Sequence, residues 1–296
     1  MNAALKGYLA AATVVVFWSG FNIVSRLGGR SVLTPYDLAA LRFAVSALLL
    51  LPFLLRLRFA ATLMQLAILS ACGGLGYALL VYWGFSLAPA AHAGILVNGG
   101  IPFATVLVAW LALGVRPAAR TLLALALAGL GIALISYESL VNEVPTSGPR
   151  WLGDLFFLAA ATAFAIFGLL LKRWRIRPLE AVVGVAVIAA SSYLPVYLLF
   201  LPKALSAAPA SVLLLQGVYQ GIIAAVLAGL LYTYANLTIG PMKASLMLAL
   251  VPGISALAAV PLLGEELSMA TLLGVALVTG GAVLGTSGQA PTRQAG

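Results

Sequence analysis

Residues 91–113, AHAGILVNGGIPFATVLVAWLAL, and residues 241–263, PMKASLMLALVPGISALAAVPLL, are two apolar stretches that match each other at a shift of 150 positions. The match extends without a gap over 91–135 and 241–285, and 13 of these 45 positions are identical. Ala and Leu match often by chance, so the coincidences of Pro102 with Pro252 and of Gly131 with Gly281 carry more weight than the count. The chain therefore contains an internal repeat.

Composition indicates a chain that lives in a lipid bilayer. Its 296 residues are 63% hydrophobic and 8% charged, against roughly 25% charged residues in a typical soluble domain. A soluble fold of this length could not hide so much apolar surface, so the bilayer must supply the apolar solvent. The net charge of +9 does not indicate nucleic-acid binding, because the basic residues lie in short loops between apolar stretches.

Ten apolar stretches have the roughly 20 residues needed to cross a bilayer as a helix. Their approximate limits are 7–25, 36–55, 64–84, 91–113, 119–137, 152–171, 180–200, 212–235, 242–263 and 269–287. The connections are short, so the sequence predicts an all-α integral membrane protein with ten transmembrane helices. We interpret the first stretch as a spanning helix and not as a removed leader, because no convincing small-residue cleavage motif follows it.

Lys and Arg set the orientation of membrane proteins, because they favour the cytoplasmic side. With the N-terminus in the cytoplasm, the inside segments hold Lys6, Arg56, Arg58, Arg116, Arg120, Lys172, Arg173, Arg175, Arg177, Lys243 and Arg293. The outside segments hold only Arg26, Arg30, Arg150 and Lys203. We therefore expect a multi-pass protein of the plasma (inner) membrane with both termini in the cytoplasm.

The loop 144–149, rich in Pro and Ser, is the expected boundary between two halves, 1–148 and 149–296. Each half has five spans, and five is odd, so the second half must be inverted relative to the first. Inverted repeats are typical of secondary transporters, which build two access states around one central site. This symmetry predicts a transporter with two inverted five-helix repeats.

Charge at one corner of the repeat agrees with the inversion. Val115-Arg116 follow Gly114 at a loop predicted to lie inside, whereas Glu265-Glu266 follow the matching Gly264 at a loop predicted to lie outside. The same corner thus carries opposite charge on opposite faces.

Several short motifs occur in order along nearly the whole chain: Phe17-Trp18-Ser19-Gly20-Phe21-Asn22, Ala40-Leu41-Arg42-Phe43, Val97-Asn98-Gly99-Gly100-Ile101-Pro102 and Leu263-Gly264-Glu265-Glu266. In these motifs the chain resembles the drug/metabolite transporter superfamily, in its ten-helix form with two EamA-type repeats. Within it, the run ending at Pro102, with Tyr77 at a comparable place in the third helix, is most similar to amino-acid exporters of the YddG type.

The resemblance implies a secondary transporter that moves small metabolites, and specifically amino acids, with aromatic ones as an option, outward across the membrane. The superfamily also includes sugar-phosphate, nucleotide-sugar and drug carriers. A carrier for another small solute, such as a drug or a sugar derivative, and a lipid flippase therefore remain alternatives.

The fourth and ninth spans carry paired interruptions. Gly99, Gly100 and Pro102 can loosen helical hydrogen bonds near mid-membrane, and Pro252 with Gly253 stands at the equivalent point. Paired Gly/Pro interruptions indicate hinges beside a binding site, although a kink that helps packing is the alternative.

Polar and aromatic residues in the first four spans are candidates for substrate binding. Trp18 and Asn22 share a face of the first helix, one turn apart; Trp18 could instead anchor the helix at the membrane interface. Asn98 is either a ligand or an interhelical hydrogen-bonding residue. Tyr77 is a further candidate, and Tyr82 either lines the site or belongs to the outer aromatic belt.

The second half supplies five more candidates. Gln220, Tyr232 and Asn236 lie in the eighth span, and some of them should face the interior because amides avoid lipid. Phe164 in the sixth span is either a ligand or a residue that faces lipid or serves packing. Lys243 opens the ninth span, where it either contacts substrate or extends towards lipid headgroups.

Two further residues lie towards the outer ends of spans. Arg42, in the second span, can reach the interface or cap a neighbour. His92, at the start of the fourth, is interpreted as a neutral and uninvolved surface residue.

The sequence favours facilitated diffusion by alternating access. No acidic residue lies near the centre of a predicted span, whereas ion-driven carriers commonly use a buried carboxylate. There is no nucleotide-binding P-loop, and one histidine with one cysteine leaves too little chemistry for a membrane enzyme. We therefore expect a monomer with no catalytic residue, metal or cofactor, whose partners are a small-molecule substrate and membrane lipid.

Overall fold

The computed structural model describes residues 2–29, 31–88, 90–141, 149–263 and 268–287, and their regular structure is entirely helical. The α-helices are α1 (Ala3–Gly29), α2 (Pro35–Arg56), α3 (Leu63–Gly73), α4 (Leu75–Leu87), α5 (Ala90–Ala93), α6 (Ile101–Leu113), α7 (Ala119–Val141), α8 (Arg150–Trp174), α9 (Pro178–Phe200), α10 (Ala210–Gln216), α11 (Ala228–Ile239), α12 (Pro241–Leu248), α13 (Leu250–Leu263) and α14 (Met269–Thr286). Two π-helices, η1 (Gly94–Asn98) and η3 (Gly217–Leu227), and a short 3₁₀-helix, η2 (Leu205–Ala207), complete them.

Nine helical stretches within the described residues are long and apolar enough to cross a membrane, and a further apolar helix, Ala119–Ile135, is shorter. They coincide with the ten predicted spans, which confirms an all-α, multi-pass membrane protein. Two predictions concern residues outside the described ranges: the boundary loop, except for Pro149, and the acidic pair Glu265-Glu266.

Four of the predicted spans are not single helices. The third consists of α3 and α4, the fourth of α5, η1 and α6, the eighth of α10, η3 and α11, and the ninth of α12 and α13. Gly74 separates α3 from α4 with φ −117° and ψ −107°, outside the helical region. These breaks lie within predicted spans, so the irregular backbone is held inside the bundle, as a bilayer requires.

The equivalent prolines of the two repeats, Pro102 and Pro252, explain two of these breaks. Pro102 has no amide hydrogen, so the carbonyl group of Asn98 loses its usual helical partner four residues later. The helix is accordingly interrupted at Gly99 and Gly100, immediately after Asn98. In the ninth span the break is at Ala249, three residues before Pro252. The helices are therefore interrupted at equivalent places in both halves.

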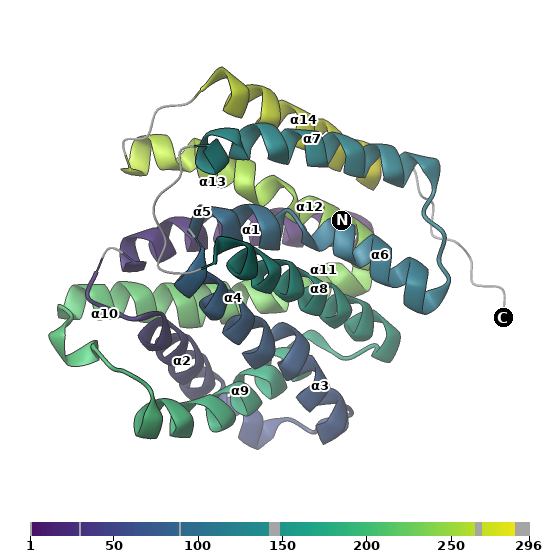
Figure 1. Cartoon of the computed structure of the whole chain (residues 1–296). Coiled ribbons are helices and arrows are strands. Elements are labelled where there is room, and N and C mark those ends of the chain that lie inside the picture. The colour runs from purple at the N-terminus through teal and green to yellow at the C-terminus, as the bar shows by residue number, and fades with distance from the viewer. Residues whose placement is uncertain (1, 30, 89, 142–148, 264–267, 288–296) are drawn as a thin grey trace.

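Helices α7 and α14 pack closely against each other through glycines (Figure 1). A Cβ atom on Gly131 would lie 2.5 Å from the carbonyl oxygen of Gly274, and one on Gly281 would lie 2.7 Å from that of Ala124. The 150-residue shift exchanges these two contacts, so the pair has internal two-fold symmetry. Late residues of one helix meet early residues of the other, so the equivalent helices run antiparallel. The second repeat is therefore inverted relative to the first.

Helices α2 and α9 form a second pair of equivalent helices, at the opposite end of the molecule from α7 and α14 (Figure 1). Between the two pairs lie α1, which packs on α11, and α4, which packs on α8. Each of these contacts joins one repeat to the other. The largest buried cluster includes Val14, Phe157, Phe164 and Tyr232, so the core of the fold lies where the repeats meet.

Candidate functional site

Five aromatic side chains from four helices form a cluster in the interior, which we call the aromatic cluster. Its members are Trp18 of α1, Tyr77 of α4, Phe164 and Phe167 of α8, and Tyr232 of α11. The Phe164 ring is central, with centroids 5.4 Å from Trp18, 5.3 Å from Tyr77 and 5.0 Å from Tyr232. Both repeats contribute, so the cluster lies where relative motion of the halves would change its shape.

Trp18 is held in the interior by a hydrogen bond to the backbone of the second repeat. Its indole Nε1 donates to the carbonyl oxygen of Ala224 in η3 at 3.2 Å. Phe164 and Phe167 are three residues apart on α8 and therefore share a face of the helix; both are buried. Trp18 therefore contacts both the aromatic cluster and the second repeat, and Phe164 packs against other rings.

Asn236 is the polar member of this region. It is fully buried, and neither atom of its amide makes a hydrogen bond of normal geometry with the residues that the structure describes; its nearest polar neighbour is the Tyr232 hydroxyl group. Tyr232 lies one turn earlier, and a Cβ atom on Gly168 would lie 2.9 Å from both the Asn236 Nδ2 and the Tyr232 hydroxyl. Burying an amide without partners costs about 1–3 kcal/mol. Asn236 therefore has hydrogen-bonding capacity that the described fold does not use.

Gln220 is buried as well, but half of its amide has a structural role. Its Nε2 donates to Ser25 Oγ and to Gln216 Oε1, each at 3.2 Å, whereas its Oε1 has no partner among the described residues. Gln216 Nε2 donates to the Val24 carbonyl oxygen at 2.8 Å. These bonds tie the C-terminal half of α1 to the second repeat, as expected of interior amides.

The remaining candidates lie outside the aromatic cluster. Asn22 Nδ2 donates to Ser255 Oγ at 3.0 Å and so links α1 to α13. Asn98 is buried at the end of η1. Tyr82 is buried in a separate hydrophobic cluster that includes Phe43. Lys243 is partly buried in the first turn of α12.

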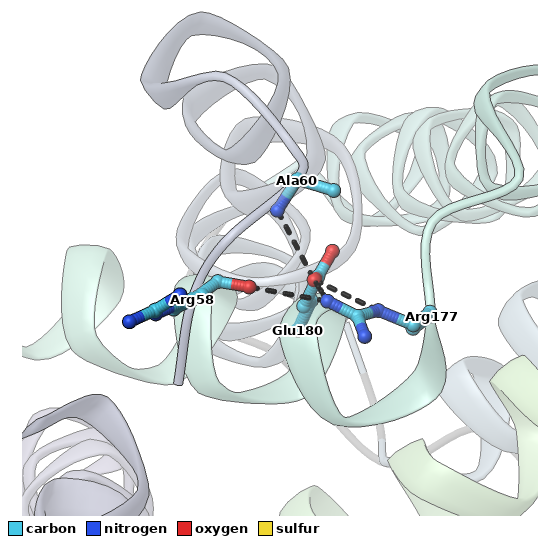
Figure 2. A network of polar contacts seen from close by, with 4 residues as sticks. All are labelled: Arg58, Ala60, Arg177 and Glu180. Atoms are coloured by element: carbon cyan, nitrogen blue, oxygen red, sulfur yellow. Dashed lines mark hydrogen bonds and ion pairs between the residues drawn. The ribbon is translucent and has the colours of Figure 1, made fainter. Parts of the chain in front are cut away.

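Two buried acidic residues join the repeats at opposite ends of the α2–α9 pair. Glu180 Oε1 accepts from the Ala60 amide at 3.1 Å and pairs with the guanidinium of Arg177, which also donates to the Arg58 carbonyl at 3.1 Å (Figure 2). Asp37 Oδ2 accepts from the Ala204 amide at 3.2 Å. We call these contacts the Glu180 clip and the Asp37 clip.

His92 contradicts the interpretation of an uninvolved surface residue. It is 3% exposed, and its Nδ1 lies 2.7 Å from Asp154 Oδ1. The pair joins α5 of the first repeat to α8 of the second. The two residues are 62 positions apart, so no local pattern could reveal the contact.

Arg42 is a further residue whose interior position the sequence reasoning missed. Its guanidinium lies over the ring of Phe21, 5.7 Å from the centroid, instead of extending to the interface. It also borders a small cavity between helices of both repeats. The signal that could have found it is the rarity of arginine within a membrane span.

Two inverted halves that share an interior cluster of aromatic and amide side chains define a class of protein, the secondary transporters built from repeats. The chain belongs to the EamA-like transporter family, whose sequence profile matches it twice, at residues 5–137 and 151–286. It is therefore a membrane transporter for a small solute. This confirms the resemblance to the superfamily and the presence of two EamA repeats.

A solved structure, described only as the crystal structure of a protein, has the same fold. It is 22% identical to the chain, with a TM-score of 0.77, and the alignment covers 96% of this chain and 98% of the other. At that identity the likeness concerns the fold alone. No curated protein matches the chain.

Proposed function

We propose that this transporter moves amino acids, including aromatic ones, outward across the plasma (inner) membrane. The observation that carries the proposal is the Asn236 amide, which is buried beside the aromatic cluster and makes no hydrogen bond of normal geometry with the described residues. An amide can donate to a carboxylate and accept from an ammonium group. Aromatic faces attract ammonium groups and pack against apolar side chains. The outward direction follows from the resemblance to exporters.

The proposed site comprises the aromatic cluster and Asn236, with the other candidates, Asn22, Tyr82, Asn98, Gln220 and Lys243, nearer its margins. The Asn22 amide already donates a hydrogen bond to Ser255. That bond would have to break before the Asn22 Nδ2 could donate to a substrate. Binding in such a site should be weak enough to permit release on the other side.

The proposed mechanism is alternating access by facilitated diffusion. The interruptions at Gly99, Gly100 and Pro102, and at Pro252 and Gly253, serve as hinges that let each half change shape. The described acids Asp37, Glu180 and Asp154 lie in the first five residues of their helices, so none of them offers an ion-coupling carboxylate near mid-membrane. Both termini are cytoplasmic in this proposal, and the unit of transport is the monomer.

A counterflow assay tests the proposal. Purified protein in liposomes preloaded with unlabelled phenylalanine or leucine should exchange them for labelled amino acid without ATP or an ion gradient. Trp18→Ala should abolish exchange, whereas Trp151→Ala, at a side chain that is 68% exposed, should retain it. No exchange of any amino acid by the wild type would contradict the proposal, and accumulation driven by a pH gradient would contradict facilitated diffusion.

One surface feature bears on the lipid-flippase alternative. A groove of about 490 Å³ lies between α6, α7 and α8 and is bordered by Gly99, Phe103, Leu107 and Leu158. Phe103, Leu107 and Leu158 are exposed, so the groove faces lipid. Thr162 is the only polar side chain among its lining residues. To cross the membrane, a lipid headgroup would need a path lined by polar side chains. The groove is therefore better suited to hold an acyl chain than to move a whole lipid across the membrane.

A further inference from the structure

We propose that Arg42 binds the anionic group of the transported solute, which makes the substrate class small organic acids with an apolar body, amino acids among them. The inference rests on the proposed function, because it assigns a partner within the same site. Arg42 lies seven residues after the start of α2 at Pro35, about 10 Å along the helix axis. A charged side chain at this depth is costly and marks a functional site whose partner must be identified.

The described protein residues do not supply a counter-ion for Arg42. The carboxylates that the structure describes, those of Asp37, Asp154 and Glu180, are each held by other partners. The contact with Phe21 is a cation–π interaction with a neutral ring, so it does not neutralise the charge of the guanidinium. A guanidinium stays protonated in proteins. No described residue therefore offers an anionic acceptor to its N–H donors.

Arg42 borders a cavity of about 60 Å³ that is lined from both repeats. Ser46 lies one turn further along α2, Gly73 comes from α3, and Phe167 and Val226 come from the second repeat. This volume corresponds to a few water molecules. It suits a carboxylate head and is too small for a whole amino acid, so the body of the solute must lie beside the cavity.

The aromatic cluster borders this cavity and is placed to receive the apolar body. Phe167 belongs to both the cavity lining and the cluster. Arg42 is also close enough to Tyr77, another member, for its charge to act on the hydroxyl group. A carboxylate paired with Arg42 would thus direct its apolar group towards the rings. The planar guanidinium can hold both carboxylate oxygens at once, which gives orientation as well as affinity.

The common alternative for an arginine in a membrane helix is that its side chain extends to the lipid headgroups. This would require the side chain to extend towards the nearer end of α2, at Pro35. The guanidinium instead lies over Phe21 of α1 and beside the interhelical cavity. Carboxylate and phosphate share the anionic chemistry that Arg recognises. The experiment therefore includes both.

Binding of four small probes to purified protein in detergent tests the inference: phenylalanine, phenylacetate, phenyl phosphate and 2-phenylethylamine. The first three carry an anionic group and the last carries none. Wild type should bind at least one of the two simple anions about tenfold or more tightly than 2-phenylethylamine. The tighter anion identifies the group that the site prefers.

Variants then assign the effect to Arg42. Arg42→Gln should weaken binding of the anions about tenfold or more, and Arg42→Lys should weaken it less, because the charge remains but the planar fork is lost. Arg56→Gln, at the exposed far end of the same helix, should bind as wild type does. If Arg42→Gln does not fold, the wild-type probe series together with Arg42→Lys decides the matter.

Equal wild-type affinity for phenylacetate, phenyl phosphate and 2-phenylethylamine overturns the inference, as does unchanged anion affinity in Arg42→Gln. Flux separates this failure from failure of the proposed function. If wild-type liposomes exchange amino acids and Arg42→Gln exchanges them equally well, only the role of Arg42 is wrong. If wild-type liposomes exchange no amino acid, the proposed function is wrong.

Discussion

Asp37 and Glu180 are each the third residue of their helix, α2 and α9, and each accepts a hydrogen bond from the loop that follows the other helix. The Ala60 amide donates to Glu180, and the Ala204 amide donates to Asp37, at 3.1 Å and 3.2 Å. A proline begins both helices. The two clips are therefore the same device, placed by the two-fold symmetry at opposite ends of the α2–α9 pair.

The clips should open independently. Glu180→Ala removes the acceptor for the Ala60 amide, so hydrogen exchange at that amide should rise on the order of tenfold, because a hydrogen bond to a charged group is worth about 1.5–3 kcal/mol. Exchange at Ala204 should not change. Asp37→Ala should give the reverse pattern. Mass spectrometry of the two loop peptides measures both, and a rise in both loops for either variant would contradict independent clips.

The α7–α14 contact should tolerate a methyl group at one glycine of α14 and not at its neighbour. A Cβ atom on Gly281 would lie 2.7 Å from the Ala124 carbonyl oxygen, whereas one on Gly280 meets nothing within 4 Å. Overpacking of this kind costs about 1–3 kcal/mol. Gly281→Ala should therefore lower the melting temperature in detergent by several degrees, and Gly280→Ala should not. Equal melting temperatures would show that the helices are not packed as described.

The Asn236 amide should lower the stability of the folded protein while it contributes to substrate binding during transport. Asn236→Leu removes a buried amide without partners, so we expect a gain of about 1–3 kcal/mol in stability together with loss of amino-acid exchange. Gln216→Leu is the matched control: Gln216 is equally buried, but its amide makes hydrogen bonds to Val24 and Gln220, so the same change should destabilise.

Melting curves and counterflow on the two Leu variants give the answer. A fall in the stability of Asn236→Leu would show that the amide has a structural partner. Undiminished exchange in that variant would remove Asn236 from the binding site.

The His92–Asp154 pair should stabilise the contact between α5 and α8. His92→Ala leaves the Asp154 carboxylate without its partner at 2.7 Å, and removing one member of a partly buried pair costs up to about 3–5 kcal/mol. We expect a lower melting temperature, and the double variant with Asp154→Ala should recover part of the loss. No recovery in the double variant would mean that the two side chains do not interact.

The sequence alone predicted the parts of the fold that depend on periodic or repeated features. The ten apolar stretches predicted the spans. The 150-residue shift, which pairs Gly131 with Gly281, agrees with the structure, where these two glycines make equivalent contacts, with Gly274 and with Ala124. Pro102 and Pro252 indicated which helices are interrupted, because proline lacks an amide hydrogen and this local effect can be recognised from a single residue in the sequence. The interior position of Gln220 and Asn236 followed from the cost of placing amides in lipid.

The sequence could not predict features that depend on which side chains meet across helices. His92 was misinterpreted because its partner, Asp154, lies in the other repeat. For Arg42 the sequence left two options, the interface or a neighbouring residue, because depth along a helix does not reveal which face points inward. Nor could the sequence show that Tyr82 packs in the cluster around Phe43 or that Asn22 is hydrogen-bonded to Ser255.

Everything proposed for transport depends on the two halves being inverted across the membrane, and this depends on α7 crossing it, although its apolar part is the shorter one. The direct measurement is labelling of single cysteines in right-side-out and inside-out vesicles with an impermeant maleimide. In a Cys72→Ala background, Arg58→Cys and Ser206→Cys mark the loops after the second and seventh spans, which are equivalent in the repeats. Labelling of the two positions from opposite sides is the predicted result. Labelling of both from the same side would contradict the inversion and, with it, the transport mechanism.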